Sequence, residues 1–250
     1  MIRFFLFILL ILPFENNAQD ADALLREAQQ QESQFKELDA FVKYSQVVRL
    51  QPSNLAVLCK CSELCIYIGG REKDKTKKAD YFKAAKTYAT AALRVNPNSS
   101  EANVVMSMAI GRLTLIASGK DKIASVNDVK LYADRAIKLD PSNFKAYHVL
   151  GKWNYEISNL NFLERTLAKL FYGDVPKASL EDAIANYEKA RSINPAYVLN
   201  YLELAKAYYR NDNKKKAIEL LNAMMPLPNH VFDDTRIKVE GNKLLKEWKD

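Results

Sequence analysis

The stretch Ala136-Ile-Lys-Leu-Asp-Pro141 ends a run of helix-forming residues at a proline, and closely related stretches occur at three other places. These are Val47-Val-Arg-Leu-Gln-Pro52, Ala92-Leu-Arg-Val-Asn-Pro97 and Ala190-Arg-Ser-Ile-Asn-Pro195. Proline cannot continue a helix, and it also restricts the conformation of the residue before it. Each stretch therefore marks the end of a helix at the same point of a repeating unit.

The residues before each proline share a second pattern. The positions twelve, eight and five residues before it lie on one face of a helix and are mostly small, which allows another helix to approach closely. They are Ala40, Tyr44 and Val47; Ala85, Ala89 and Ala92; Val129, Ala133 and Ala136; and Ala183, Tyr187 and Ala190.

A third pattern follows the prolines. The positions six, nine and ten residues after Pro141 and Pro195 carry two large residues and then a small one, as in the first helix of a tetratricopeptide (TPR) unit. They are Tyr147, Leu150 and Gly151, and then Tyr201, Leu204 and Ala205. The sequence thus predicts an all-α, TPR-like solenoid.

The spacing of the repeat is longer than that of a plain TPR. The four prolines are 45, 44 and 54 residues apart, against about 34 for a TPR unit. The additional residues fall between the two helices of each hairpin, where insertions leave the stacking surfaces intact. In the last interval, Leu160 to Phe171 has an apolar helical face, which predicts an inserted amphipathic helix. We expect it to pack on the solenoid; the alternative is a surface for a partner or a membrane.

These patterns divide the chain into a signal segment, 1–18, and one solenoid domain, 19–250. A last helix over about 233–249, with an apolar stripe that includes Ile237, Leu245 and Trp248, is expected to cap the open end. The predicted hairpins cover about 20–51, 53–96, 98–140, 142–194 and 196–225.

The first eighteen residues are typical of a secretory signal. Arg3 is followed by an apolar run from Phe4 to Leu12, which is too short to span a bilayer, and Pro13 ends it. We expect cleavage between Ala18 and Gln19, giving a periplasmic or secreted protein. The alternative is an uncleaved N-terminal membrane anchor.

Residue chemistry argues against catalysis and against cofactors. The chain has 2 histidines and 3 cysteines, and none of them has further ligands at the spacing of a metal site. No P-loop, His-Glu-x-x-His or Gly-x-Ser-x-Gly pattern occurs. The net charge is +7, but the lysine runs lie at turns and lack interleaved aromatics, so we expect no nucleic-acid partner. The sequence therefore predicts a protein that is not an enzyme.

A partner surface can be placed from the register of the repeat. In a TPR stack the first helix of each unit lines the concave face, and its inward positions lie about four, seven, eleven and fourteen residues after each proline. Lys145, Lys152 and Lys206 make this face basic, which predicts an acidic protein or peptide in the groove. The candidate partner-binding residues are Met108, Arg112, Lys145, His148, Lys152, Tyr155, Leu202, Lys206 and Tyr209.

One longer stretch is more specific than a general TPR. Residues Leu150 to Gly173 contain Asn-Leu, Leu-Glu-Arg and Leu-Phe-Tyr-Gly segments, followed by Pro176 and by Ala183-Ile-Ala-Asn-Tyr-Glu-Lys-Ala190. This stretch resembles the regulator of microtubule dynamics proteins, and the likeness extends to 132–143 and 213–221. The resemblance implies a TPR-like helical fold, protein binding and, in animal members, association with microtubules. Together with the signal segment, it suggests an exported bacterial relative.

The hypothesis from the sequence is therefore a non-catalytic scaffold or adaptor that binds a protein or peptide in its concave groove. Two alternatives remain open. One is a regulator associated with microtubules, as in the animal members of the family that the chain resembles. The other is an envelope-associated protein that contacts a membrane through the Leu160–Phe171 helix and no other part.

The signal segment gives a first testable prediction. When the complete chain is expressed with its own first eighteen residues, the mature protein should begin at Gln19, because the apolar run is long enough for export but too short to remain as a span. Intact-mass measurement of the exported protein checks the cleavage site. A protein that keeps Met1 and stays with the membrane fraction would instead support the anchor.

Overall fold

A computed structural model describes residues 15–116, 120–161, 165, 166, 169 and 176–249. In these ranges the chain forms α-helices and no β-strand. The helices are α1 (Glu15–Ser33), α2 (Glu37–Leu50), α3 (Leu55–Arg71), α4 (Lys75–Val95), α5 (Ser100–Thr114), α6 (Lys120–Leu139), α7 (Phe144–Ser158), α9 (Leu180–Ile193), α10 (Val198–Arg210), α11 (Lys214–Met224) and α12 (Asp234–Lys249).

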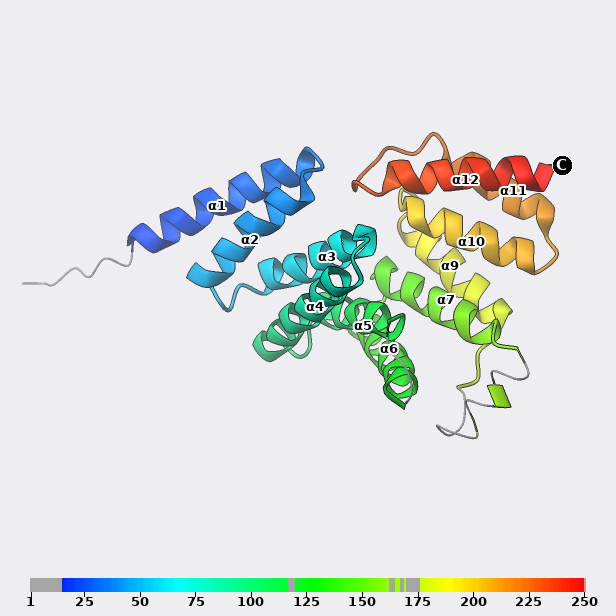
Figure 1. Cartoon of the computed structure of the whole chain (residues 1–250), viewed down its shortest axis with the longest axis horizontal. Coiled ribbons are helices and arrows are strands. Elements are labelled where there is room, and N and C mark those ends of the chain that lie inside the picture. Colours follow the sequence, from blue (N-terminus) through cyan, green and yellow to red (C-terminus); the bar gives the residue numbers. More distant parts are fainter. Residues whose placement is uncertain (1–14, 117–119, 162–164, 167–168, 170–175, 250) are drawn as a thin grey trace, which may run out of the picture.

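Helices that are neighbours in the sequence pair as hairpins: α1 with α2, α3 with α4, α5 with α6, α7 with α9, and α10 with α11 (Figure 1). The first helices of successive hairpins also contact one another, from α3 to α5, α7 and α10, so they form a continuous inner layer. Helix α12 closes the stack against α10 and α11. This arrangement confirms the predicted all-α, TPR-like solenoid.

The proline turns end the helices. Helices α2, α4, α6 and α9 each end two residues before the proline of the repeat. After three of the prolines a polar residue caps the next helix, because its side chain accepts a hydrogen bond from the backbone N–H three residues later. The capping residues are Asn54, Ser99 and Asn143. The cap of α10 is Tyr197, which makes no such bond.

The position ten residues after each proline holds the two helices of a hairpin close together. It is occupied by Ser62, Ser107, Gly151 and Ala205, all buried. Ser62 Oγ donates to the carbonyl of Ala85 at 2.9 Å and Ser107 Oγ to that of Val129 at 2.6 Å, so the backbones of paired helices are almost in contact. At Gly151, the ring of Tyr187 takes the space that a side chain would need.

The far end of the stack is covered by an apolar face of α12. Ile237, Leu245 and Trp248 are buried in one cluster with residues of α10 and α11. Gly241 lies against Met224, where a Cβ atom would come within 2.3 Å of the Met224 side chain. The last helix therefore buries the surface that the fifth hairpin would otherwise expose.

Two predictions from the sequence fall largely outside the described residues. The signal segment, 1–18, is described only from Glu15, where α1 begins. The inserted helix over 160–171 is described at a few positions, and of these Arg165 donates to the carbonyl of Ile157 at 2.7 Å, at the end of α7. Within the described ranges, no helix has the length and apolar character needed to cross a membrane.

The Gly151 contact gives a prediction with an internal control. Gly151→Ala should lower the free energy of unfolding by about 1–3 kcal/mol, because the new Cβ would lie 2.6 to 2.8 Å from the ring of Tyr187. Gly70→Ala, also in a helix but with no atom within 4 Å, should leave stability unchanged or raise it by up to about 1 kcal/mol. Urea unfolding followed by circular dichroism compares the two. Equal effects would show that the close approach is not tight.

Candidate functional site

The inner face of the solenoid carries most of the residues that the sequence placed in a partner site. They come from three first helices, α5, α7 and α10, which lie next to one another in the inner layer. The structure brings these residues onto one surface but changes the interpretation of several of them. The largest change concerns the lysines.

Lys145 on α7 is held by two carboxylates of earlier hairpins. Its Nζ lies 2.8 Å from Glu63 on α3 and 2.9 Å from Glu101 on α5. Glu63 is nearly buried, and burial by itself would raise the pKa of its carboxyl group. The neighbouring Lys145 and Lys60 outweigh burial and, with hydrogen bonds from Lys145 and Tyr67, lower that pKa to about 2. The inner face is therefore tied across three hairpins by a charged cluster.

Lys152 and Lys206 are paired in the same way, at the other end of the inner face. Lys152 Nζ lies 2.8 Å from Glu203 on α10 and 2.9 Å from Glu156 one turn along its own helix. Lys206 lies 3.5 Å from Glu203 and 2.8 Å from Glu240 on α12. All three lysines predicted to attract an acidic partner are therefore already bonded to carboxylates of this chain.

His148 is buried between α7, α9 and α10. Its Nδ1 lies 2.9 Å from Oδ1 of Asn200, whose amide nitrogen donates to the carbonyl of Tyr187. The rings of Tyr187 and Tyr197 lie 5.4 and 5.0 Å from the imidazole, centroid to centroid. Burial lowers the pKa of His148 to about 4, so the imidazole is neutral at neutral pH. This histidine joins two hairpins and presents little surface to a partner.

The apolar and aromatic candidates differ in how much surface they offer. Leu202 is only 1% exposed and belongs to the core, which corrects the expectation that it contacts a partner. Met108 is half-buried between two apolar clusters. Tyr209 is stacked on Trp248 with ring centroids 4.1 Å apart, so α12 covers one of its faces.

Arg112 and Tyr155 are the candidates that stay available at the inner face. Both are half-buried. Within the described part of the chain, Arg112 has no hydrogen bond or ion pair, although it is near enough to influence the titration of His148 and Tyr197. The ring of Tyr155 lies 5.6 Å from the Lys152 ammonium and 5.2 Å from the Arg210 guanidinium.

A second charged cluster joins the two ends of the solenoid. Arg71 at the end of α3 lies 2.5 Å from Glu37 on α2 and 3.0 Å from Asp233, just before α12. The backbone N–H of Phe232 donates to Glu37 at 3.3 Å, and the Arg71 guanidinium lies 4.8 Å from the Phe232 ring. Phe232 and Glu37 are 195 positions apart in the sequence. The loop before α12 thus reaches back to the first two hairpins.

The carboxylates of the inner face were not recognised from the sequence as partners of the lysines, although the register put two of them at inward positions. Glu101, four residues after Pro97, is one of these. Glu63 lies eleven residues after Pro52, which is one of the inward positions of the repeat. Glu203 lies eight residues after Pro195, next to an inward position. The register therefore placed the lysines correctly on the inner layer, but it did not show which carboxylates of other hairpins they would meet.

The described residues offer little for catalysis. They contain no group of three or more His, Cys, Asp or Glu side chains placed to hold a metal ion. The thiols of Cys59, Cys61 and Cys65 are buried, and burial raises the pKa of each to about 12, so they are protonated and unreactive. As far as the described residues show, the inner face can present paired charges, the guanidinium of Arg112 and the ring of Tyr155 to a partner.

The comparisons with known proteins give one family. A family model described as Regulator of microtubule dynamics protein 1-3 matches residues 18–249. Regulator of microtubule dynamics protein 1 of Caenorhabditis elegans is 29% identical over 76% of this chain and 82% of its own length. The proteins of the same name from Bos taurus and Homo sapiens are 28% and 27% identical over 77% and 72% of this chain. The chain spans 61% and 57% of those two mammalian relatives.

Solved structures agree with the fold. A thermophilic TPR protein of Thermus thermophilus superposes with a TM-score of 0.66 at 13% identity, over 90% of this chain and 99% of the other. Yeast Tom70 superposes with a TM-score of 0.57 at 13% identity, over 94% of this chain and 41% of its own. At such low identity these likenesses concern the fold alone.

The buried histidine gives a pH-dependent prediction. The unfolded chain binds a proton at His148 near its ordinary pKa of 6.5, whereas the folded chain does so only near 4. The free energy of unfolding should therefore decrease as the pH falls through this window, by roughly 2 kcal/mol between pH 6.5 and 4.5. His148→Gln should flatten that slope, as measured by urea unfolding at several pH values.

The other histidine, His230, is exposed in the loop before α12 and supplies the control. His230→Gln should keep the slope of the wild-type protein. If wild type and His148→Gln lost stability equally between pH 6.5 and 4.5, the buried neutral imidazole would not be the cause.

Proposed function

Because this chain belongs to the regulator of microtubule dynamics protein family, we propose that it is a non-catalytic scaffold that binds a protein or peptide. The observation that carries this proposal is the inner face of α5, α7 and α10, where Arg112 and Tyr155 remain available among side chains that are already bonded. A row of stacked hairpins with an exposed polar face is a surface for another chain, because it is long, rigid and built from several units.

The arrangement of charges supports binding over chemistry. A catalytic acid, base or nucleophile needs a pKa that is tuned toward the working pH. In this protein the environment moves pKa values away from the working pH. The pKa of the Glu63 carboxyl group is held far below neutrality, and the pKa values of the cysteine thiols far above it. These groups keep one protonation state throughout the physiological range.

An acidic partner would have to compete with the carboxylates of this chain for the lysines of the inner face. A carboxylate from a partner would have to replace Glu63, Glu101 or Glu203 at a lysine of the inner face. Arg112 is the exception, since an incoming carboxylate could pair with it without breaking a bond of the folded chain. We therefore place the first contact of a partner at Arg112, with Tyr155 of the next first helix as a second contact.

A role at microtubules is the second candidate, and the observation that favours it is family membership. The relatives are named as regulators of microtubule dynamics, and this chain spans only part of the mammalian ones. Export through the predicted signal segment would separate the protein from cytosolic microtubules. The two proposals are therefore alternatives for one chain.

Contact with a membrane through residues 160–171 is a third proposal, which liposome flotation tests.

Site-specific photocrosslinking in the native host tests the scaffold. A photoreactive amino acid at position 112 or 155 should give the same crosslinked partner, identified by mass spectrometry. The same amino acid in place of Val239, which is 64% exposed on α12, is the control and should not. A partner crosslinked only at position 239 would contradict the inner face as the site. Absence of any co-purifying or crosslinked protein would contradict the scaffold itself.

Co-sedimentation with polymerised tubulin tests the second candidate. Residues 19–250 should stay in the supernatant if the chain is an exported scaffold. Saturable sedimentation with microtubules would favour the alternative.

A further inference from the structure

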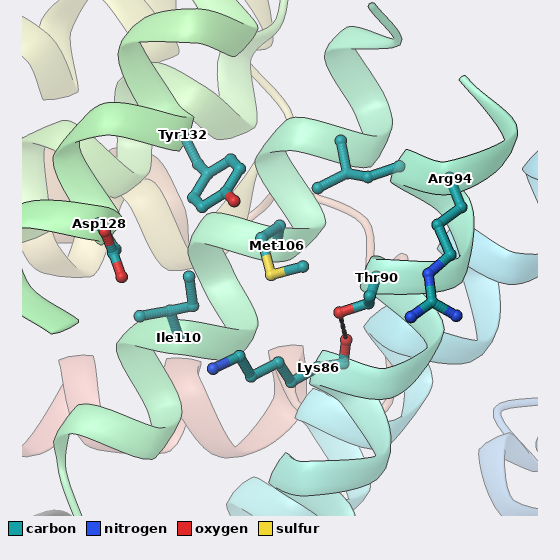
Figure 2. A pocket seen from close by; sticks show the side chains of 8 residues that line it. Lys86, Thr90, Arg94, Met106, Ile110, Asp128 and Tyr132 are labelled. Carbon is teal, nitrogen blue, oxygen red and sulfur yellow. Dashed lines mark hydrogen bonds between the residues drawn. The ribbon is translucent and has the colours of Figure 1, made fainter. Parts of the chain in front are cut away.

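The outer side of the solenoid has a hollow between α4, α5 and α6 that faces away from the inner face. Figure 2 shows Lys86, Thr90 and Arg94 on α4, Met106 and Ile110 on α5, and Asp128 and Tyr132 on α6 around it. Met106 and Ile110 lie two residues from Met108 and Arg112, which places them on the opposite side of α5. The hollow has a volume of about 340 Å³.

The hollow lies where the backbones of α4 and α6, in the described part of the chain, stay apart from each other while both helices pack on α5. Its floor is apolar: Met106 and Ile110 lie deepest and are 4% exposed, whereas Leu93 and Tyr132 are half-buried and offer most of the apolar surface. Such a recess between two outer helices can take apolar side chains of another chain without any rearrangement of the hairpins.

On the α4 side, the rim of the hollow carries only positive charge. Lys86 and Arg94 are exposed, and among the described residues neither has an ion-pair partner. This distinguishes them from the lysines of the inner face, each of which is bound to at least two carboxylates. Lys86 and Arg94 are eight residues apart on one helix, which separates them by about 12 Å along its axis.

The rest of α4 strengthens this positive potential. The helix has a single acidic residue, Asp80, and its six basic residues give it a net charge of +5, against +7 for the whole chain. The basic residues are Lys75, Lys77, Lys78, Lys83, Lys86 and Arg94. Most of the excess charge of the protein is therefore concentrated on one outer helix, beside an apolar recess. Charge complementarity then favours an acidic occupant.

We propose that the hollow between α4, α5 and α6 binds an acidic peptide segment of a partner protein. An apolar side chain of the peptide contacts Leu93 and Tyr132 over the floor of Met106 and Ile110, and flanking carboxylates pair with Lys86 and Arg94. In an extended peptide, residues two apart share one face and four residues span about 13 Å. The pattern Glu-x-Leu-x-Glu therefore matches the separation of about 12 Å between the two cations. This inference rests on the proposed scaffold function and assigns it a second, outer site.

The structure favours a peptide over a nucleic acid or an anionic membrane. Asp128 is exposed on the α6 rim of the same hollow and repels any anion placed beside it. A nucleic acid carries a phosphate at every residue, whereas a peptide can place its carboxylates at α4 and leave the α6 side uncharged. An apolar floor recessed between two helices suits individual side chains and not a flat lipid surface. A peptide donor opposite the carboxylates could pair with Asp128, which would fix the direction in which the segment lies.

A methyl NMR titration of residues 19–250 tests the proposal. The probe is the blocked heptapeptide Ala-Glu-Ala-Leu-Ala-Glu-Ala, and the same peptide with Gln in place of Glu is its control. The acidic probe should shift the methyl signals of Met106 and Ile110 in a saturable way, and the Gln peptide should bind about tenfold more weakly. Higher salt should weaken the binding of the acidic probe, because its contacts are exposed ion pairs.

Two double variants with the same change of charge locate the site. Lys86→Glu with Arg94→Glu should reduce the affinity for the acidic probe at least about tenfold while leaving the unfolding temperature nearly unchanged. Lys214→Glu with Lys215→Glu, at exposed positions on α11, should bind the probe like wild type. Equal loss in both variants would mean a general charge effect and would overturn the proposal.

The remaining outcomes also decide the question. If the acidic probe leaves the Met106 and Ile110 signals unshifted, the hollow is not a peptide site. If single-stranded oligonucleotides or anionic vesicles shift these signals at lower concentration than the peptide, an acidic peptide is not the ligand of the hollow. Neither result would contradict the scaffold function if crosslinking at position 112 or 155 captures a partner. The two experiments therefore distinguish failure of the outer site from failure of the scaffold.

Discussion

The residue ten positions after each proline limits how closely the two helices of a hairpin can approach. Ser62 and Ser107 are small enough to bring the helices together and polar enough to bond the facing backbone carbonyl. Gly151 leaves room for the ring of Tyr187, and Ala205 is buried without any exposed surface. Larger side chains at these positions would separate the helices of a unit. The curvature of the stack is largely the sum of these local contacts, because most of the packing of each unit is against its neighbours.

That curvature decides which charges meet on the inner face. Lys145 on the fourth hairpin reaches Glu63 on the second, past the hairpin between them. Glu63 already has Lys60 and Tyr67 as partners on its own helix, and Lys145 adds a third partner that ties this buried carboxylate to the fourth hairpin. Arg71 forms a similar tie, since it bonds residues from both ends of the chain. The packing of apolar residues sets the bend, and these ion pairs stabilise it.

The distribution of charge could be predicted only in part. The register of the repeat correctly placed Lys145, Lys152 and Lys206 on the inner layer, but carboxylate partners of the first two come from hairpins 44 and 51 residues away. The inner face is therefore close to neutral, and the uncompensated positive charge lies on the outer surface of α4. Leu202 shows a similar limit, since an inward position on a helical wheel can still be covered by the neighbouring helix.

The sequence by itself determined the helices, their ends and their pairing into hairpins. Prolines, capping residues and the spacing of small and large side chains act within one or two helical turns, so they can be interpreted without knowledge of the rest of the chain. Only the tertiary structure decided which charges are paired, that the loop before α12 returns to the first two hairpins, and where a recess forms between α4 and α6. These features depend on small rotations between successive units that add up along the stack, and no local pattern of residues specifies that sum.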